Sequence, residues 1–350
     1  MLTVAEFFVW LVAGIYFYVL PLIDRAIAEA DARDDLEAQR ALTVPKAPRS
    51  AFTARRLTPT TFLIVEVNDI FNEHPFIYAK IFAEAKEILL VDTGCGGMSR
   101  DPTVEITSLR EFLETVDVPD NGGRPLNVGG QMGYAVVLSH CHYDHILGVE
   151  QFAVDSPIYE SAHLPSFVSS QNLPKNSHCK ALGVRTPSFE PTLVPHRSRL
   201  VFFAPDFSTN VVLLHTPGHT PDEVALWDTD ENMLYVGDTL YEFEPIIFPA
   251  EGDIVDWLGS IDMLMDVVLG STSPERALIN CGHRTTMRPA KEVLQSTKAF
   301  MMDVLAGKMK VHRRETRRGI EYVEYVQPDQ RYRLTCPEVL ILGARERLDL

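Results

Sequence analysis

The sequence is poor in cysteine and lacks any paired cysteine motif. An odd number of widely scattered cysteines does not support a disulfide framework, and without a CxxC pair a structural zinc knuckle is excluded. We therefore expect reduced thiols and an intracellular protein. The 350 residues contain five cysteines: Cys95, Cys141, Cys179, Cys281 and Cys336.

Positive charge is also scarce. The chain has 32 Lys and Arg against 48 Asp and Glu, which gives a formal net charge of -16. Such a protein is repelled by phosphate backbones, so we expect a small-molecule substrate and no nucleic acid. The arginines at 313, 314, 317 and 318 are interpreted as a solvated face, or as a contact to anionic lipid if the N-terminus is an anchor. We find no basic cluster suited to a glutathione carboxylate.

Only one long apolar run is present, at residues 7–23. It begins FFVWLVAGIYFYVL and is borderline for a spanning helix, which needs about 20 apolar residues. Three interpretations stay open: a membrane anchor, a helix packed on the domain or on a partner, and a cleaved signal. The expected location is intracellular, either cytoplasmic or anchored through this segment. The oligomeric state is left open by the sequence.

Three parts of the chain are distinguished by their composition. Residues 1–57 hold the apolar segment, a charged helix over 24–42 and a proline-punctuated linker; residues 58–305 form the folded domain; residues 306–350 are an extension. In the extension, EYVEYV (321–326) is predicted to be an added edge strand.

Within the domain, runs of β-branched and aromatic residues predict strands, and apolar residues at helical spacing predict helices. Strands come first in each half, which favours an α+β fold of two packed sheets with helices outside. The strands are expected at 61–67, 76–82, 87–92, 134–140, 200–204, 211–215, 223–227, 233–238 and 277–280, and the helices at 107–116, from 144, at 253–269 and at 290–305.

The segment His140-Cys141-His142-Tyr143-Asp144-His145 carries the strongest chemical signal. Alternate residues of an extended chain point the same way, so His140 and His142 can reach one ion together. If a helix follows, Asp144 and His145 project toward a second position. Imidazole and carboxylate suit zinc, iron or manganese. Cys141 is expected to point away from the ions.

HCHYDH resembles the HxHxDH signature of the metallo-β-lactamase superfamily, which includes glyoxalase II-like hydrolases and N-acyl-homoserine lactonases. Further motifs follow in the family's order over about residues 60–305. The resemblance implies a four-layer αββα sandwich, here with an N-terminal helical extension. The motifs that carry it are Asp92 in LLVDTGCGG, His219 in HTPGHTPD, Asp238 in YVGDTLY and His283 in NCGHR.

Carried over residue by residue, the resemblance implies a centre for two divalent ions, with Zn²⁺ expected although manganese, iron or cobalt also suit these ligands. Asp92 would support the site from behind. The first ion would take His140, His142 and His219; the second would take Asp144, His145 and His283, with Asp238 between them.

This ligand set implies hydrolysis by a metal-bridging hydroxide. Asp144 would orient or transfer a proton. Tyr241, three residues after Asp238, is placed as in the lactonases and would polarise the substrate. We therefore expect a hydrolase of a cyclic ester or cyclic amide, with the helix of Trp257 and residues 153–198 shaping the pocket.

Two alternatives stay open, a glyoxalase II-like thioesterase and a non-catalytic metal-binding scaffold. A nuclease of this superfamily would need a basic groove, which is not evident in the sequence. A flavodiiron oxidoreductase would have Glu in place of His142 and a flavin domain after the core, and the sequence has neither. His215 is not at the family's ligand position. The remaining histidines are expected to be surface or core residues rather than ligands: His74, His163, His178, His196 and His312.

Overall fold

The computed structural model describes residues 48–202 and 208–350, and the chain from Arg49 onward forms one compact unit. The segments 7–23 and 24–42 lie outside the described residues. Within the described ranges, no helix has both the length and the apolar character that crossing a membrane requires.

The first sheet has seven strands whose order in space is their order in sequence. Neighbours from β1 to β4 are antiparallel, and those from β4 to β7 are parallel. Its strands are β1 (Phe52–Arg56), β2 (Thr61–Glu66), β3 (Phe76–Phe82), β4 (Glu87–Val91), β5 (Gly133–Val137), β6 (Ile158–Ser161) and β7 (Pro191–Val194). Strand β1 lies inside the segment that the sequence assigns to the linker, so the domain begins before residue 58. Its sequence, FTARR, sits at a sheet edge with mostly polar side chains and therefore carries no apolar strand pattern.

The second sheet has six strands, in the order β14-β13-β11-β10-β9-β8. They are β8 (Ser198–Val201), β9 (Ser208–His215), β10 (Val224–Asp228), β11 (Met233–Tyr235), β13 (Leu278–Asn280) and β14 (Arg288–Pro289). The helices are α3 (Leu109–Thr115), α4 (Tyr143–Ile146), α5 (Leu173–Asn176), α6 (Cys179–Leu182), α7 (Ile254–Leu269) and α8 (Ala290–Leu305), with short 3-10 turns at Pro119–Asn121, Val128–Gly130, Val149–Gln151 and Pro274–Arg276.

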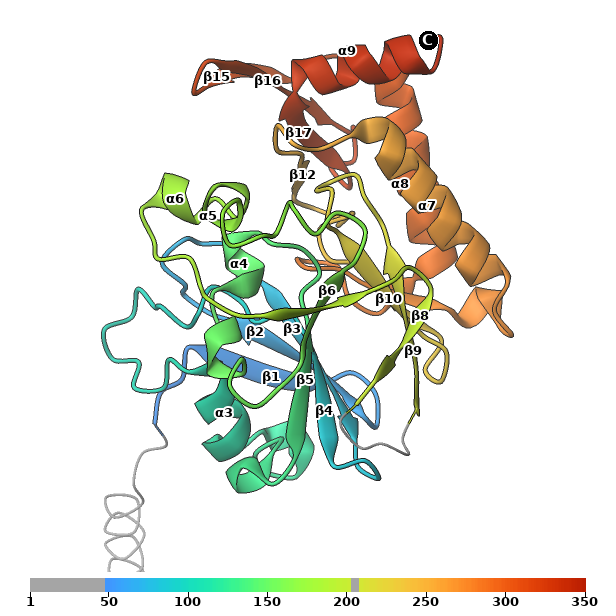
Figure 1. Cartoon of the computed structure of the whole chain (residues 1–350). Helices are drawn as coiled ribbons and strands as arrows, with labels where there is room; N and C mark the ends of the chain where they lie inside the picture. The colour runs from blue at the N-terminus through green and yellow to red at the C-terminus, as the bar shows by residue number, and fades with distance from the viewer. Residues whose placement is uncertain (1–47, 203–207) are drawn as a thin grey trace, which may run out of the picture. The chain divides into compact units, whose positions relative to one another are not determined.

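Alternation along the strands separates the molecule into layers (Figure 1). In β2, Leu63 packs between the two sheets, while Phe62 and Ile64 join the cluster under α3. The outer face of the second sheet packs against α7 and α8 in a third cluster. Because successive side chains of a strand point to opposite faces, apolar runs of this kind are buried on both sides. The expected αββα sandwich is confirmed.

A third, four-stranded sheet contains most of the extension. Its order is β12-β17-β16-β15, formed by β12 (Pro245–Ile247), β15 (Arg313–Arg317), β16 (Ile320–Val326) and β17 (Arg333–Pro337), and helix α9 (Glu338–Arg347) follows it. The prediction that 321–326 is an edge strand is wrong, because β16 pairs with β15 on one side and with β17 on the other. Residues such as Val323 and Leu334 join the cluster of α7 and α8, so the extension is part of the domain's core.

Candidate metal centre

The HCHYDH segment leaves the first sheet where β5 ends. His140 and His142 lie in the loop after Val137, and α4 begins at Tyr143. His142 has an extended backbone (φ -64°, ψ 148°), which ends the loop just before the helix. Asp144 and His145 then lie on the first turn of α4, so one short segment supplies four of the predicted ligands.

Two more predicted ligands come from matching positions of the second sheet. Strands β11 and β13 are parallel, and Tyr235 is paired with Asn280. Asp238 and His283 each follow that pair by three residues, so the register alone brings them to the same end of the sheet. The backbone N–H of Gly282 donates to the carbonyl of Gly237 at 2.6 Å, which joins the two turns.

His219 lies in the loop between β9 and β10, and Trp257 fixes that loop. A Cβ on Gly218 would lie 2.5 Å from the Cα of Trp257, so only glycine permits this approach. The indole N–H of Trp257 donates to the carbonyl of Thr239 at 2.6 Å, beside Asp238. Trp257 is fully buried and does not line the pocket, contrary to the expectation that its helix shapes the pocket wall.

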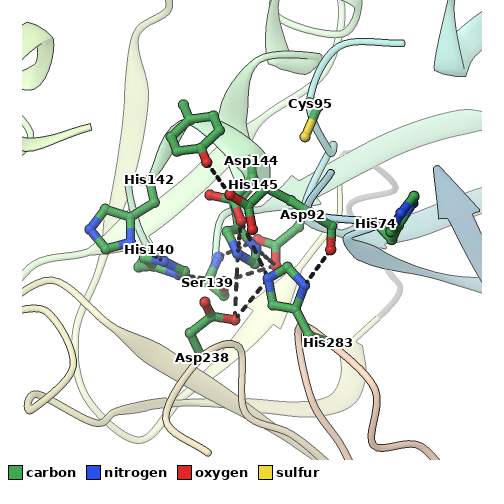
Figure 2. A network of polar contacts seen from close by, with 12 residues as sticks. His74, Asp92, Cys95, Ser139, His140, His142, Asp144, His145, Asp238 and His283 are labelled. Carbon is green, nitrogen blue, oxygen red and sulfur yellow. Dashed lines mark hydrogen bonds and ion pairs between the residues drawn. The ribbon is translucent and has the colours of Figure 1, made fainter. Parts of the chain in front are cut away.

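The seven predicted side chains form two adjacent groups of potential ligands, and Figure 2 labels all of them except His219. In the first, Nδ1 of His142 lies 2.9 Å from Nε2 of His140 and 3.1 Å from Nε2 of His219. In the second, Nε2 of His145 lies 3.4 Å from Oδ2 of Asp144 and 3.5 Å from Oδ1 of Asp238. His283 lies at 3.3 and 3.6 Å from the same two oxygens.

Asp92 holds the site from behind. One carboxylate oxygen accepts from the backbone N–H of Ser139 at 2.7 Å; the other accepts from the Ser139 hydroxyl at 2.8 Å and from Nδ1 of His145 at 2.8 Å. This contact orients His145 so that Nε2 faces the two aspartates. Asp92 itself has a φ of 67°, an uncommon backbone conformation that Asp tolerates better than most residues. The predicted supporting role of Asp92 therefore agrees with these contacts, and Ser139 takes part in the same hydrogen-bond network.

Glu73, which the sequence does not single out, supports the other face of the centre. Nδ1 of His283 lies 3.0 Å from its carbonyl oxygen, and the Tyr143 hydroxyl donates to its carboxylate. Asp69 holds this loop by accepting backbone N–H groups at Phe71, Glu73 and His74. Burial, followed by the charge of Asp144, raises the pKa of Glu73. A loop glutamate outside any motif gives no sequence signal for such a role.

The two groups differ in charge. Burial, and then the neighbouring imidazoles, lower the pKa of His140 and His142 well below the usual value, so both are neutral, the form in which histidine binds metals. Burial also opposes charge on His145 and His283, but Asp144 and Asp238 outweigh it and raise both pKa values, that of His283 to about 9. The second group therefore holds two buried carboxylates that require positive charge beside them.

The donors fit a metal ion in each group. Nε2 of His145 and Oδ1 of Asp238 are buried and have no hydrogen-bond partner among the described residues, although buried polar atoms are normally paired. Nitrogens bound to one zinc ion at about 2.1 Å lie about 3.4 Å apart in tetrahedral geometry, and the nitrogens of the first group, at 2.9 and 3.1 Å, would need only a small outward shift to bind one ion together. Histidine and carboxylate are also the donor types that such ions take.

A cavity of about 560 Å³ opens onto these ligands. Val65, Val67 and Phe76 line it from the first sheet, and Ile247 and Tyr322 line it from the third. Tyr241 lines it too, with its ring 5.4 Å from that of His283. Burial raises the pKa of Tyr241, so the hydroxyl stays a neutral donor.

Residues 153–198 contribute less to the cavity than expected, since among the described lining residues His178 alone comes from that region. His178 stacks on His142 with centroids 4.7 Å apart. His74 also lines the cavity, and both histidines fall outside the ligand groups, as predicted. Outside these groups too are His215, which contacts Ser161, and Cys141, which is buried in the core under α3. All five cysteines are unpaired.

A model of the metallo-beta-lactamase superfamily matches residues 81–270. A curated protein named putative transcription factor avaE, from Aspergillus versicolor, is 35% identical over 306 residues, covering 85% of this chain and 89% of that protein. The human acyl-coenzyme A thioesterase MBLAC2 is 24% identical and covers 53% of this chain and 65% of that protein. A hydroxyacylglutathione hydrolase from Bartonella henselae is 29% identical and covers 43% and 49%.

Solved structures share the fold. A metallo-beta-lactamase family protein from Thermus thermophilus gives a TM-score of 0.52 at 18% identity, covering 75% of this chain and 86% of that one. A metallo-beta-lactamase from Pontibacter korlensis gives 0.50 at 14% identity, covering 72% and 99%.

Proposed function

Because the chain belongs to the metallo-beta-lactamase superfamily, we propose that it is a dinuclear metal-dependent hydrolase of an acyl thioester. The observation that carries this proposal is the pair of adjacent ligand groups at a cavity large enough for a small molecule. The first ion would be held by His140, His142 and His219, and the second by Asp144, His145 and His283, with Asp238 between them. A net charge of -16 makes nucleic acid an unsuitable substrate.

The choice of a thioester rests on two relatives. The human relative is named an acyl-coenzyme A thioesterase and the bacterial one a hydroxyacylglutathione hydrolase, and both names describe cleavage of an acyl thioester. The chain matches 65% and 49% of their lengths, so the activity is carried over as a proposal.

Thioester hydrolysis adds the oxygen of water to the acyl carbon, breaks the C–S bond and releases a carboxylic acid and a thiol. Bound divalent ions lower the pKa of a coordinated water from about 15.7 to near 7 and polarise the carbonyl. Asp144 lines the cavity and would orient the attacking water and take up its proton. Tyr241, a neutral donor in the cavity, would hydrogen-bond to the carbonyl oxygen as negative charge develops there. Asp92 and Ser139 would hold His145 and His140 in place.

A cyclic ester or amide is the second candidate, and Tyr241 is the observation that favours it. Its ring lies against His283 at the cavity wall, where the hydroxyl could also reach the oxygen that leaves when a lactone opens. Replacing Tyr241 by Phe tests the role of its hydroxyl in either reaction. We expect a loss of about 100–1000-fold in kcat, the range for removing one such donor, with the metals retained, and the class of substrate that the wild type turns over separates the candidates.

The test measures metal content on the full-length chain together with hydrolysis of acyl thioesters and of a lactone and lactam panel. We expect about two ions per chain and release of free thiol, both reduced in Asp238→Ala. Lactone turnover without thioester turnover would replace the first candidate by the second. A folded, metal-loaded protein that cleaves neither class would contradict both candidates.

A further inference from the structure

The third sheet has two unlike faces. Side chains at 323, 325, 334 and 336 pack into the cluster of α7 and α8. The opposite face, here called the arginine shelf, carries the side chains that alternate with these along the strands. Its charged members are Arg313, Glu315, Arg317, Glu324 and Arg333, and they line a second cavity of about 180 Å³ together with Tyr322 and Thr335.

The strand register places the shelf residues in rows. Ile247 is paired with Thr335, Thr335 with Glu324, and Glu324 with Arg313, so one row runs across all four strands. With strands about 4.8 Å apart, such a row spans about 14 Å. The shelf is continuous with the metal cavity, because Pro245, Ile247, Arg317 and Tyr322 line both. A ligand long enough to reach from one cavity into the other would lie along these four residues.

The shelf is positive within a strongly acidic protein. Three arginines face two glutamates there, whereas the whole chain has a net charge of -16. Glu315 is shared between Arg313, at 2.6 Å, and Arg317, so one carboxylate serves two guanidinium groups. Arg333 pairs with Glu324, yet its Nε is buried and has no hydrogen-bond partner in the part of the chain that the structure describes. Arg317 also lies 4.9 Å over the ring of Tyr322, at the border of the two cavities.

We propose that the arginine shelf binds an anionic group on the thiol half of the thioester, so that the substrates of this chain are acyl thioesters of a negatively charged thiol. This inference rests on the proposed function. The apolar side chains of Val65, Val67 and Phe76 line the metal cavity and suit the acyl chain. The shelf extends from that cavity across the third sheet, where the thiol half would bind. Guanidinium groups bind phosphate and carboxylate through paired hydrogen bonds. The shelf would recognise the negatively charged oxygen atoms that phosphate and carboxylate have in common.

The test compares three thioesters of one acyl group in the full-length metal-loaded enzyme. One thiol carries phosphates (coenzyme A), one carries carboxylates (glutathione) and one is neutral (N-acetylcysteamine). We expect the wild-type enzyme to prefer an anionic thiol in kcat/KM, and we expect added salt to reduce that preference because salt screens exposed charges. Turnover of the neutral thioester reports on the proposed function alone, and the ratio of charged to neutral kcat/KM reports on the shelf.

Arg313→Gln and Arg333→Gln are the test variants, and Arg314→Gln is the matched control. Arg314 lies on the same strand as Arg313, pairs with Glu338 outside the shelf and lines neither cavity. Each shelf variant should lower the charged-to-neutral ratio about 10-fold, mainly through KM, because losing one guanidinium removes charge-assisted hydrogen bonds to the anion. A ratio that falls for coenzyme A or for glutathione supports the shelf and identifies its anion as phosphate or carboxylate. No preference in the wild type, or an equal loss in Arg314→Gln, would overturn the proposal.

Discussion

Gly282 offers a test of the geometry around Asp238, because this turn has no room for a side chain. An alanine Cβ there would lie 2.4 Å from Oδ1 of Asp238 and 2.9 Å from Cε1 of His145. Real Cβ atoms essentially never approach within 3.0 Å, so Oδ1 must move by at least about 0.6 Å. The backbone cannot easily retreat, since Gly282 donates to the carbonyl of Gly237 at 2.6 Å.

Metal–ligand distances in proteins fall within about 0.2 Å of standard values, so a displacement of about 0.6 Å should weaken binding in the second group. We expect Gly282→Ala to lose about 10–100-fold in affinity for one ion, the range for disturbed support of a metal ligand. The first group, His140, His142 and His219, should keep its ion. The assay is metal content per chain at a series of buffered free-metal concentrations, with hydrolysis measured on the same samples.

Gly259→Ala is the control. Gly259 is exposed on α7, and no atom lies within 4 Å of the position that a Cβ would take there, so alanine should raise stability by up to about 1 kcal/mol and leave metal binding unchanged. Thermal midpoints of the metal-free proteins show whether Gly282→Ala still folds. Wild-type affinity for both ions in a folded Gly282→Ala protein would refute the assignment of Asp238 to the second group.

Two further predictions concern buried carboxylates. Asp92→Asn should lower kcat about 10–100-fold at saturating metal, because the amide cannot hold both Ser139 and Nδ1 of His145 as the carboxylate does; unchanged kcat would contradict a supporting role. Burial, and then Asp222, raise the pKa of Glu160 to about 8. Between pH 4.5 and about 8 the folded chain therefore keeps a proton that the unfolded chain releases. The free energy of unfolding should fall as the pH rises through this window. Glu160→Gln should reduce this pH-dependent loss of stability by a few kcal/mol, since each pKa unit corresponds to about 1.4 kcal/mol. The measurement is urea unfolding of wild type and variant at both ends of the pH window. The same dependence of stability on pH in both proteins would contradict the prediction.

The sequence predicts the metal centre better than the cavity around it. The seven ligand positions follow strand ends or a short helix, and local patterns such as HCHYDH mark them in the sequence. Register then brings distant positions together, as with Asp238 and His283 at the ends of parallel β11 and β13. The cavity walls depend on tertiary contacts that no local pattern records. Glu73 enters through a loop held by Asp69, and Arg317 enters through a sheet built from the extension.

The C-terminal extension shows why the prediction of an edge strand at 321–326 fails. IEYVEYV is rich in β-branched and aromatic residues, which correctly indicates a strand, and in the structure its burial alternates, with Val323 and Tyr325 inside. Whether such a strand is central or at an edge depends on its partners, and the polar residues of β15 give no sign that it pairs with β16. The scattered arginines likewise become a cluster only when β15 and β17 lie on either side of β16.

The parallel pairing of β12 with β17 has a consequence for the order in which the nascent chain matures. Every predicted ligand precedes residue 284, but Ile247 can meet its partner Thr335 only once synthesis has passed residue 335. Contacts between positions so far apart form late, because closing a long loop costs entropy before the contact stabilises it. During translation, the predicted metal ligands are therefore synthesised before the strand that completes one wall of the cavity, so a chain able to bind metal would form ahead of one with the complete cavity.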